Sequence, residues 1–279
     1  MASTSSSQLP QPAPWKASFH EHVTNMDSPE FVFSSLHTTA GSIEYGGPPM
    51  ASPRARFCIY RGFWGELPEN QDSQAPQNPR VYESDLPTFT TDVRMNKSME
   101  LFASSSGRAD NPRLAQGSGG GGPCEAVWWA KHAMVQWRVR GKAFVVGPDI
   151  EDQESSGVRT VKSEIGRRMR VVSEEDKETW SWGKELTAHF GNLSPGRRGS
   201  FKAPPPGQPV DRPYDDQKLQ LGGKVEDLHD ATAREHFRVV IIRPQEVESI
   251  DLSDPQKSRR QRYTYDAATG SWTHQECWP

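Results

Sequence analysis

The stretch Val-Gln-Trp-Arg-Val-Arg-Gly at residues 135–141 decides the fold class, because its apolar and polar side chains alternate. Successive side chains of a β-strand point to opposite faces of the sheet, so this period of two predicts a strand with one buried face. The glycine that closes the stretch, Gly141, predicts a bulge or bend. We expect this strand to continue to residue 146.

Further apolar stretches on both sides predict a mainly β chain. We expect additional strands at residues 56–63, 86–91, 125–130, 237–243 and 247–252, and a closing hairpin at residues 260–277. In the strand at residues 56–63, Arg56, Cys58 and Tyr60 share one face, while Phe57, Ile59 and Arg61 share the other.

The segments between these strands carry less regular signals. A short helix is expected at residues 98–104, with Met99 and Leu101 or Phe102 turned inward. The segment around residues 28–33 fits either a helix or a strand. The glycine-rich residues 117–123 lack the ending of a nucleotide-binding loop, so a flexible hairpin connection is favoured there.

A polar, partly helical insertion interrupts the strands. Ser173 with Asp176 resembles a capping box, which predicts a helix that runs to Phe190 and stops at Gly191, followed by an irregular segment. Strands broken by one such insertion predict an α+β chain with a small closed β-barrel and helices against it. We expect a disordered leader at residues 1–14 and one domain at 15–279, in which an insertion at 148–235 separates core segments 30–147 and 236–279.

Composition narrows the functional classes. The net charge of −3 argues against a general nucleic-acid binder, and no apolar run approaches the 18 residues of a membrane span. The three cysteines are odd in number and widely spaced, so neither a disulfide framework nor a cysteine-based zinc site is expected, and no other metal site is predicted. These features favour a cytoplasmic protein that binds neither nucleic acid nor membrane.

One turn carries a candidate ligand site. Residues 90–97, Thr-Thr-Asp-Val-Arg-Met-Asn-Lys, end a strand in hydroxyls and place Arg94 and Lys97 in the turn that follows. Two cations three positions apart can converge on one dianion, which arginine holds in bidentate fashion and lysine as a point charge. Taken alone, such a turn is more often a solvated connection.

Together with three other segments, this turn resembles the pyridoxamine-5'-phosphate-oxidase-like, FMN-binding split barrels, and most closely their divergent branch with a TD-x-R-x-x-K loop. The other segments are residues 53–63, residues 125–129 followed by 135–141, and the ending at residues 260–279, which closes on Trp278-Pro279. The resemblance spans residues 30–147 and 236–279. It implies a Greek-key split barrel that forms a homodimer and holds FMN at the subunit interface.

The resemblance also implies roles for individual residues. It places Arg56, Phe57, Cys58, Ile59 and Arg61 beside the flavin. It assigns Thr90, Thr91, Asn96 and Lys97 to the phosphate turn, where Arg94 replaces a cation that the oxidase proper has at position 96. Gln136 would read the polar edge of the flavin ring, and Arg262 would reach across to the partner's FMN.

The pattern departs from the oxidase proper where that enzyme recognises its substrate. Its Arg-x-His group before the final arginine corresponds here to Ser258, Arg259 and Arg260, and its flavin-stacking tryptophan corresponds to Leu252. The resemblance therefore does not extend to activity on pyridoxamine phosphate, and no catalytic residue is assigned. Three hypotheses remain: an FMN-dependent oxidoreductase that transfers hydride from an unidentified small molecule to the flavin, a non-catalytic FMN-holding module, and a barrel without flavin that serves in assembly.

Overall fold

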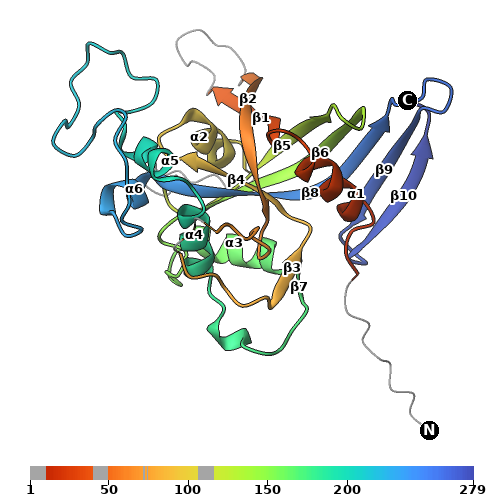
Figure 1. Ribbon diagram of the computed structural model, residues 1–279, viewed down its shortest axis with the longest axis horizontal. Helices are drawn as coiled ribbons and strands as arrows, with labels where there is room; N and C mark the ends of the chain where they lie inside the picture. The colour runs from red at the N-terminus through yellow and green to blue at the C-terminus, as the bar shows by residue number, and fades with distance from the viewer. Residues whose placement is uncertain (1–10, 40–49, 72, 74, 106–115) are drawn as a thin grey trace.

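The computed structural model describes residues 11–39, 50–71, 73, 75–105 and 116–279. Its main feature is an antiparallel sheet of order β10-β9-β8-β4-β2-β1-β5-β6, and a further pairing of β8 with β6 closes the strands from β8 to β6 into a barrel. The strands are β1 (Glu30–Thr39), β2 (Met50–Phe63), β3 (Tyr82–Ser84), β4 (Pro87–Asp92), β5 (Gly119–Ala130), β6 (Val135–Val146), β7 (Met169–Val171), β8 (Phe237–Asp251), β9 (Arg259–Asp266) and β10 (Ser271–Cys277). The hairpin of β9 and β10 stands at one end of the molecule (Figure 1).

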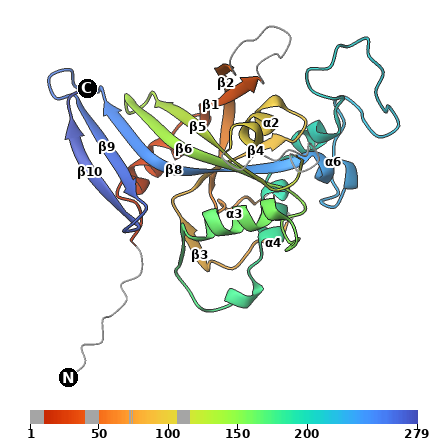
Figure 2. The same ribbon diagram turned by 180° about the vertical axis from the view of Figure 1, so that it is seen from behind.

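Helices flank this barrel, as the sequence predicts for the α+β class. They are α1 (Lys16–Thr24), α2 (Asn96–Ala103), α3 (Ser156–Gly166), α4 (Trp182–Gly191), α5 (Pro195–Gly199) and α6 (Ala231–His236). Helices α3 and α4 lie on the same side of the sheet, below β8 in both views (Figures 1 and 2). None of the helices in the described ranges is long and apolar enough to cross a membrane.

Strand β8 is one long strand, although the sequence predicts two. One edge pairs with β6 from Val146 to Val135, while the other edge pairs first with β4 and then with β9. Gly141 of β6 faces Pro244 at a register shift, so the predicted bulge is confirmed. A Cβ at position 141 would collide with the backbone of Arg243, and this close approach lets β8 continue past its proline.

Two hydrophobic cores lie on opposite faces of β8. Val240 and Ile242 point into the barrel, whose interior holds a dense group of aromatic rings including Phe19, Phe31, Phe33, Phe89, Trp128 and Trp137. Val239 and Ile241 point the other way and pack against the insertion. Both faces of this part of the strand are therefore buried, which explains why residues 239–242 form a continuous apolar run without alternation.

The insertion is more helical than expected at its start and less so later. Helix α3 begins at Ser156, well before the helix that the sequence predicts from Ser173, and it is capped by the Ser155 hydroxyl. The helix predicted from Ser173 is wrong in its start, because Asp176 has a left-handed backbone (φ 59°) and α4 begins only after Ser181, whose hydroxyl accepts from the Lys184 amide at 3.1 Å. Its predicted end at Gly191 is confirmed.

Three smaller expectations fail. The glycine-rich segment leads into β5, where Gly119, Gly120 and Gly121 have positive φ, and a Cβ at Gly119 or Gly121 would collide with the ring of Phe102 or Phe144. Met99 is 46% exposed, because α2 turns Leu101 and Phe102 inward instead. Ala13 is buried and donates its amide to Asp85 at 3.1 Å, so the ordered chain begins before Trp15. The undecided segment near residue 30 is strand β1.

Candidate functional site

The turn between β4 and α2 leaves the start of a helix without a cap. Met95 precedes α2 in an extended conformation and makes no side-chain cap bond, and the first turn of this described helix contains no acidic residue. The first amides of a helix lack intrahelical partners and carry a partial positive charge. A negatively charged group would therefore be stabilised at this position.

Lys97 adds a full positive charge to the same place. Its Nζ donates to the Thr91 hydroxyl at 3.1 Å and to the Met95 sulfur at 2.8 Å, and the residue is only 9% exposed. Burial lowers the pKa of Lys97, and no carboxylate of the described residues lies within ion-pair distance of it. A buried lysine at a helix N-terminus is opposed by desolvation and by the helix dipole alike, so its charge calls for an anion.

Arg56 lies nearby but is already paired. Its guanidinium contacts Glu100 of α2 at 2.7 Å and the Ser35 hydroxyl at 2.6 Å. Arg56 and Lys97 both act on the buried Cys58, yet burial dominates and raises the pKa of this thiol to about 11. The structure thus brings Arg56, Cys58 and Lys97 together, and it adds Glu100, which sequence reasoning missed although it lies on α2 three positions after Lys97.

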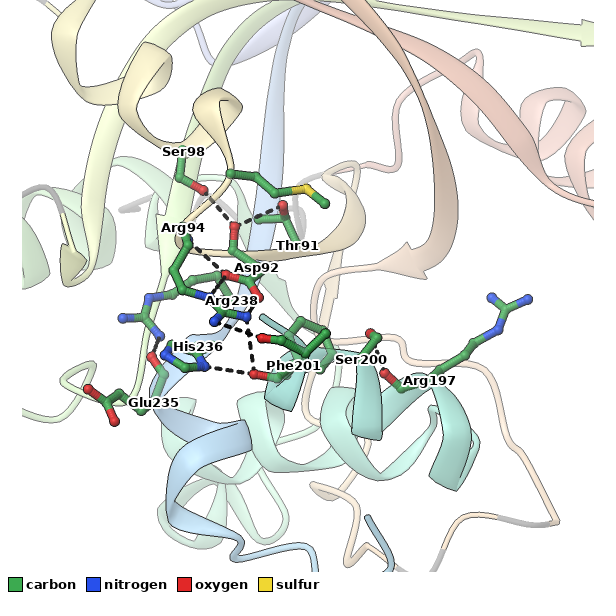
Figure 3. Close-up of polar contacts among 12 residues, drawn as sticks. Thr91, Asp92, Arg94, Ser98, Arg197, Ser200, Phe201, Glu235, His236 and Arg238 are labelled. Carbon is green, nitrogen blue, oxygen red and sulfur yellow. Dashed lines mark hydrogen bonds and ion pairs between the residues drawn. The ribbon is translucent and has the colours of Figure 1, made fainter. Parts of the chain in front are cut away.

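Arg94 points away from this cluster, toward the insertion. Its Nε and Nη2 donate to the Asp92 carboxylate at 2.9 and 2.6 Å, and Nη1 donates to the carbonyl of Ala203 at 3.0 Å. Figure 3 shows this guanidinium beside the Phe201 carbonyl, which also contacts His236 Nδ1 at 2.7 Å. In this conformation Arg94 ties the turn to the insertion, and its donors are used inside the protein.

The outward face of β2 is open, as its alternation predicts. Phe57 is 76% exposed, and Ile59 and Arg61 are partly exposed. Burial, followed by repulsion from Arg197 of α5, lowers the pKa of Arg61 to about 10. Arg61 forms no ion pair with a carboxylate in the described ranges, and its Nε has no hydrogen-bond partner there.

Gln136 lies far from the phosphate turn within one chain. Thr90 pairs with Val239 near the start of β8, whereas Gln136 pairs with Ile250 near its end. At about 3.3 Å per residue, the intervening strand spans roughly 36 Å. The predicted ring-edge residue and the predicted phosphate turn therefore lie at opposite ends of the barrel.

Arg262 lies at the same end as Gln136. It pairs with Glu248 across β8 and β9, and its Nε donates to the Glu248 carboxylate at 3.0 Å. The guanidinium groups of Arg138 and Arg260 contact the same carboxylate, which is almost fully buried. Sequence reasoning missed Glu248, which follows Val247 on the strand predicted at residues 247–252.

Comparison with known families identifies the class of this chain. Residues 12–147, about half of the chain, match the family described as pyridoxamine 5'-phosphate oxidase, FMN-binding domain. The chain belongs to this pyridoxamine 5'-phosphate-oxidase-like family, as the order of its motifs predicts. Membership makes it an FMN-binding flavoprotein by class.

Two solved structures align with the chain. A pyridoxamine 5'-phosphate oxidase-related, FMN-binding protein from Nostoc punctiforme aligns with a TM-score of 0.58 at 14% identity, and the alignment covers 97% of this chain and 100% of that one. PhzG from Burkholderia lata, solved with tetrahydrophenazine-1-carboxylic acid, aligns with a TM-score of 0.43 at 13% identity over 97% of this chain and 94% of that one. No curated protein sequence matches the chain. The Nostoc structure supports the split-barrel fold and, at this identity, nothing finer.

Proposed function

We propose that this protein is an FMN-dependent oxidoreductase that acts on a small molecule and works as a homodimer. The observation that carries the proposal is the buried ammonium of Lys97, which has no partner carboxylate among the described residues and lies at an uncapped helix start. This donor set fits the phosphate of FMN, because a phosphate dianion accepts hydrogen bonds from an ammonium group, a hydroxyl and free helix amides together.

The phosphate end of the site would be built from three residues of one chain. Lys97 supplies the charge, Thr91 supplies a hydroxyl already within 3.1 Å of Lys97 Nζ, and Asn96 lies exposed at the first position of α2. Thr90 precedes them on β4. Arg94 supports the shape of the turn through Asp92 and the insertion, so its contribution to phosphate binding would be indirect.

The ring end of the site would come from a second chain. The barrel interior is filled by its own aromatic side chains, so a flavin has to lie on the outer face. Gln136 and Arg262 are too far along β8 to meet Lys97 of their own chain. In a two-fold dimer the partner would bring them to the exposed face of β2 and cover Phe57, giving two equivalent sites.

When bound, FMN supplies a hydride acceptor, which is the chemistry that a side chain cannot provide. The residues of the chain would bind and orient it. The Gln136 amide can both donate to and accept from the ring edge, and the partner surface would exclude water from the ring.

The first experiment is cofactor binding and turnover by the purified full-length protein. We expect a yellow preparation that releases FMN on denaturation and whose colour is bleached anaerobically by a substrate from a panel of amines, aldehydes and reduced nicotinamides. A colourless preparation that takes up no added FMN would refute the flavin site. Tight FMN binding without bleaching by any panel member would favour the non-catalytic FMN-holding alternative.

The second experiment tests the assembly. Light scattering should give about twice the 31.2 kDa mass of one chain. Arg262→Ala should reduce the free energy of FMN binding by more than it reduces the free energy of unfolding of the apoprotein. A monomer that binds FMN at full occupancy would contradict the shared site.

A further inference from the structure

A concave site lies away from the Lys97 turn. It is a cleft of about 760 Å³ between α1, the segment that follows β2, and α4. Its walls include Ala17 of α1, Phe63 at the end of β2, and Glu185 and Ala188 of α4. A cleft of this size can hold a small organic molecule.

The cations that line the cleft are already balanced. Lys16 contacts Glu66 at 2.7 Å, and Arg80 lies 3.9 Å from Glu83. Two further carboxylates line the cleft, those of Glu69 and Glu185. Glu69 lies at the exposed rim, whereas Glu185 is 3% exposed and forms part of the floor.

Glu185 is held in place by neutral groups. Its carboxylate accepts from the Gly65 amide at 3.2 Å and from the Asn78 side-chain amide at 2.8 Å. His189 lies 3.9 Å away, but burial lowers the pKa of this histidine to about 3, so it is uncharged at neutral pH. Burial also raises the pKa of Glu185, because no cation of the described residues offsets the loss of water.

His189 shows that the polar groups behind the cleft are incomplete. Its ring stacks on Trp64 and is fully buried, and neither ring nitrogen has a hydrogen-bond partner among the described residues. Buried polar groups in proteins are normally satisfied. A cleft floored by an acid without a cation, with a histidine without a hydrogen-bond partner behind it, is typical of a binding site.

The remaining walls of the cleft favour an organic ammonium ion over a metal ion. Phe63, Leu67, Ala17 and Ala188 present apolar surface to the cleft. A metal ion would need several oxygen ligands, and no three metal-ligating side chains converge anywhere in the described ranges. An ammonium group needs only one carboxylate and a few neutral acceptors, and its organic part can contact the apolar wall.

We propose that this cleft binds a small organic amine in its ammonium form, with the Glu185 carboxylate as the acceptor for the ammonium group. The site is separate from the Lys97 turn and does not rest on the proposed flavin function.

The experiment compares benzylamine, which is an ammonium ion at neutral pH, with its uncharged analogue benzyl alcohol. Binding to the full-length protein is followed by saturation-transfer NMR and isothermal titration calorimetry. We expect benzylammonium to bind at least about tenfold more tightly than benzyl alcohol, and Glu185→Gln to remove this preference, because a charge-assisted hydrogen bond contributes at least that factor. Equal binding of the two probes, or no binding of benzylammonium at about 10 mM, would overturn the proposal.

Two further variants keep the test independent of folding. Ala17→Trp fills the cleft from the exposed side of α1 and leaves the buried polar groups untouched, so it should abolish benzylammonium binding in a folded protein. Glu69→Gln removes the same charge as Glu185→Gln but at the rim, and should change the affinity by less than about twofold. Unchanged binding in Ala17→Trp, or an equal loss in Glu69→Gln, would show that the amine does not bind at Glu185.

Discussion

Lys97 and Glu185 are both buried and both lack a partner of opposite charge among the described residues, yet their surroundings differ in kind. Lys97 lies at a helix start, where the backbone adds to its positive charge. Glu185 also lies in the first turn of a helix, where the dipole favours its negative charge, and it is surrounded by neutral donors and by a neutral histidine. The first region concentrates positive potential and the second leaves a single negative charge in an apolar wall.

The difference indicates what each region can bind. A site in which a lysine, a hydroxyl and helix amides point the same way suits a group with several acceptor oxygens, such as a phosphate. A site with one carboxylate beside apolar side chains suits one small cation with an organic body. The two regions are therefore expected to respond independently to mutation.

The largest expected effect is on the pH dependence of stability in the cleft region. Because the pKa of His189 falls from 6.5 to about 3 on folding, its neutral form stabilises the protein fully above pH 6.5, and this contribution is lost as the pH falls toward 3. Each pH unit below 6.5 lowers the free energy of unfolding by about 1.4 kcal/mol, which amounts to about 2.7 kcal/mol at pH 4.5. His189→Phe keeps a ring against Trp64, so in urea unfolding it should flatten the dependence of the free energy of unfolding on pH. Glu185, whose pKa is raised, contributes a slope of the opposite sign, and it does so in the parent and in the variant alike. Parallel slopes for the two proteins would mean that His189 is charged or solvated.

The next effect is on FMN affinity at the Lys97 turn. Lys97→Met removes one charge-assisted partner of a dianion, worth about 1.5 to 3 kcal/mol, so the dissociation constant of FMN should rise about ten- to hundredfold. Riboflavin, which lacks the phosphate, should bind the variant as well as it binds the parent. Lys218→Met, at a side chain that is 72% exposed, is the matched control and should leave both affinities unchanged. Equal losses for FMN and riboflavin would place Lys97 outside the phosphate site.

A third prediction separates Arg94 from Lys97. Arg94→Met breaks the ion pair with Asp92 and the bonds to the insertion, so it should destabilise the protein by about 1.5 kcal/mol in chemical unfolding. FMN affinity should change by less than the Lys97 substitution changes it, because the guanidinium faces Asp92 and the insertion. If Arg94→Met weakens FMN as much as Lys97→Met at unchanged stability, the direct phosphate contact predicted from the sequence is right.

The smallest expected effect concerns the ring edge. Gln136→Leu removes one neutral hydrogen-bonding group, worth about 0.5 to 1.5 kcal/mol. The dissociation constant of the flavin should therefore rise about two- to tenfold, or its reduction potential should shift by an equivalent free energy. The position is partly exposed on β6, so the fold should survive. A folded variant with unchanged affinity, spectrum and potential would remove Gln136 from the site. Amine binding in the cleft should not change in this variant or in Lys97→Met.

The fold was predictable where one face of a strand meets water. The period of two in β6 locates its buried residues Val135, Trp137 and Val139, and the strand bounds 135–146 are confirmed. The prediction fails for the length of β8, because residues 239–242 are buried on both faces without alternation and the strand continues through Pro244 and the polar residues after it. It fails again at Gly119–Gly121, because glycines that allow close packing look the same in sequence as glycines that allow flexibility.

The candidate site was predictable in its composition but not in its contacts. The spacing of Arg94 and Lys97 suggests that both converge on one ligand, yet Arg94 turns toward Asp92 and toward carbonyls more than 100 positions later in the chain. Such long-range partners leave no local signal. The cleft at Glu185 could not be foreseen for the same reason, since α1, the end of β2 and α4 meet only in the folded protein.

The placement of β8 between two cores has a consequence for protein engineering. Val239 and Ile241 on one face, together with Phe144 and Val146 of β6, are covered by the insertion. A shortened chain without the insertion would present this apolar strip to water, on a strand whose other face already belongs to the barrel. We expect such a minimal barrel to aggregate, so the insertion cannot be treated as a removable appendage.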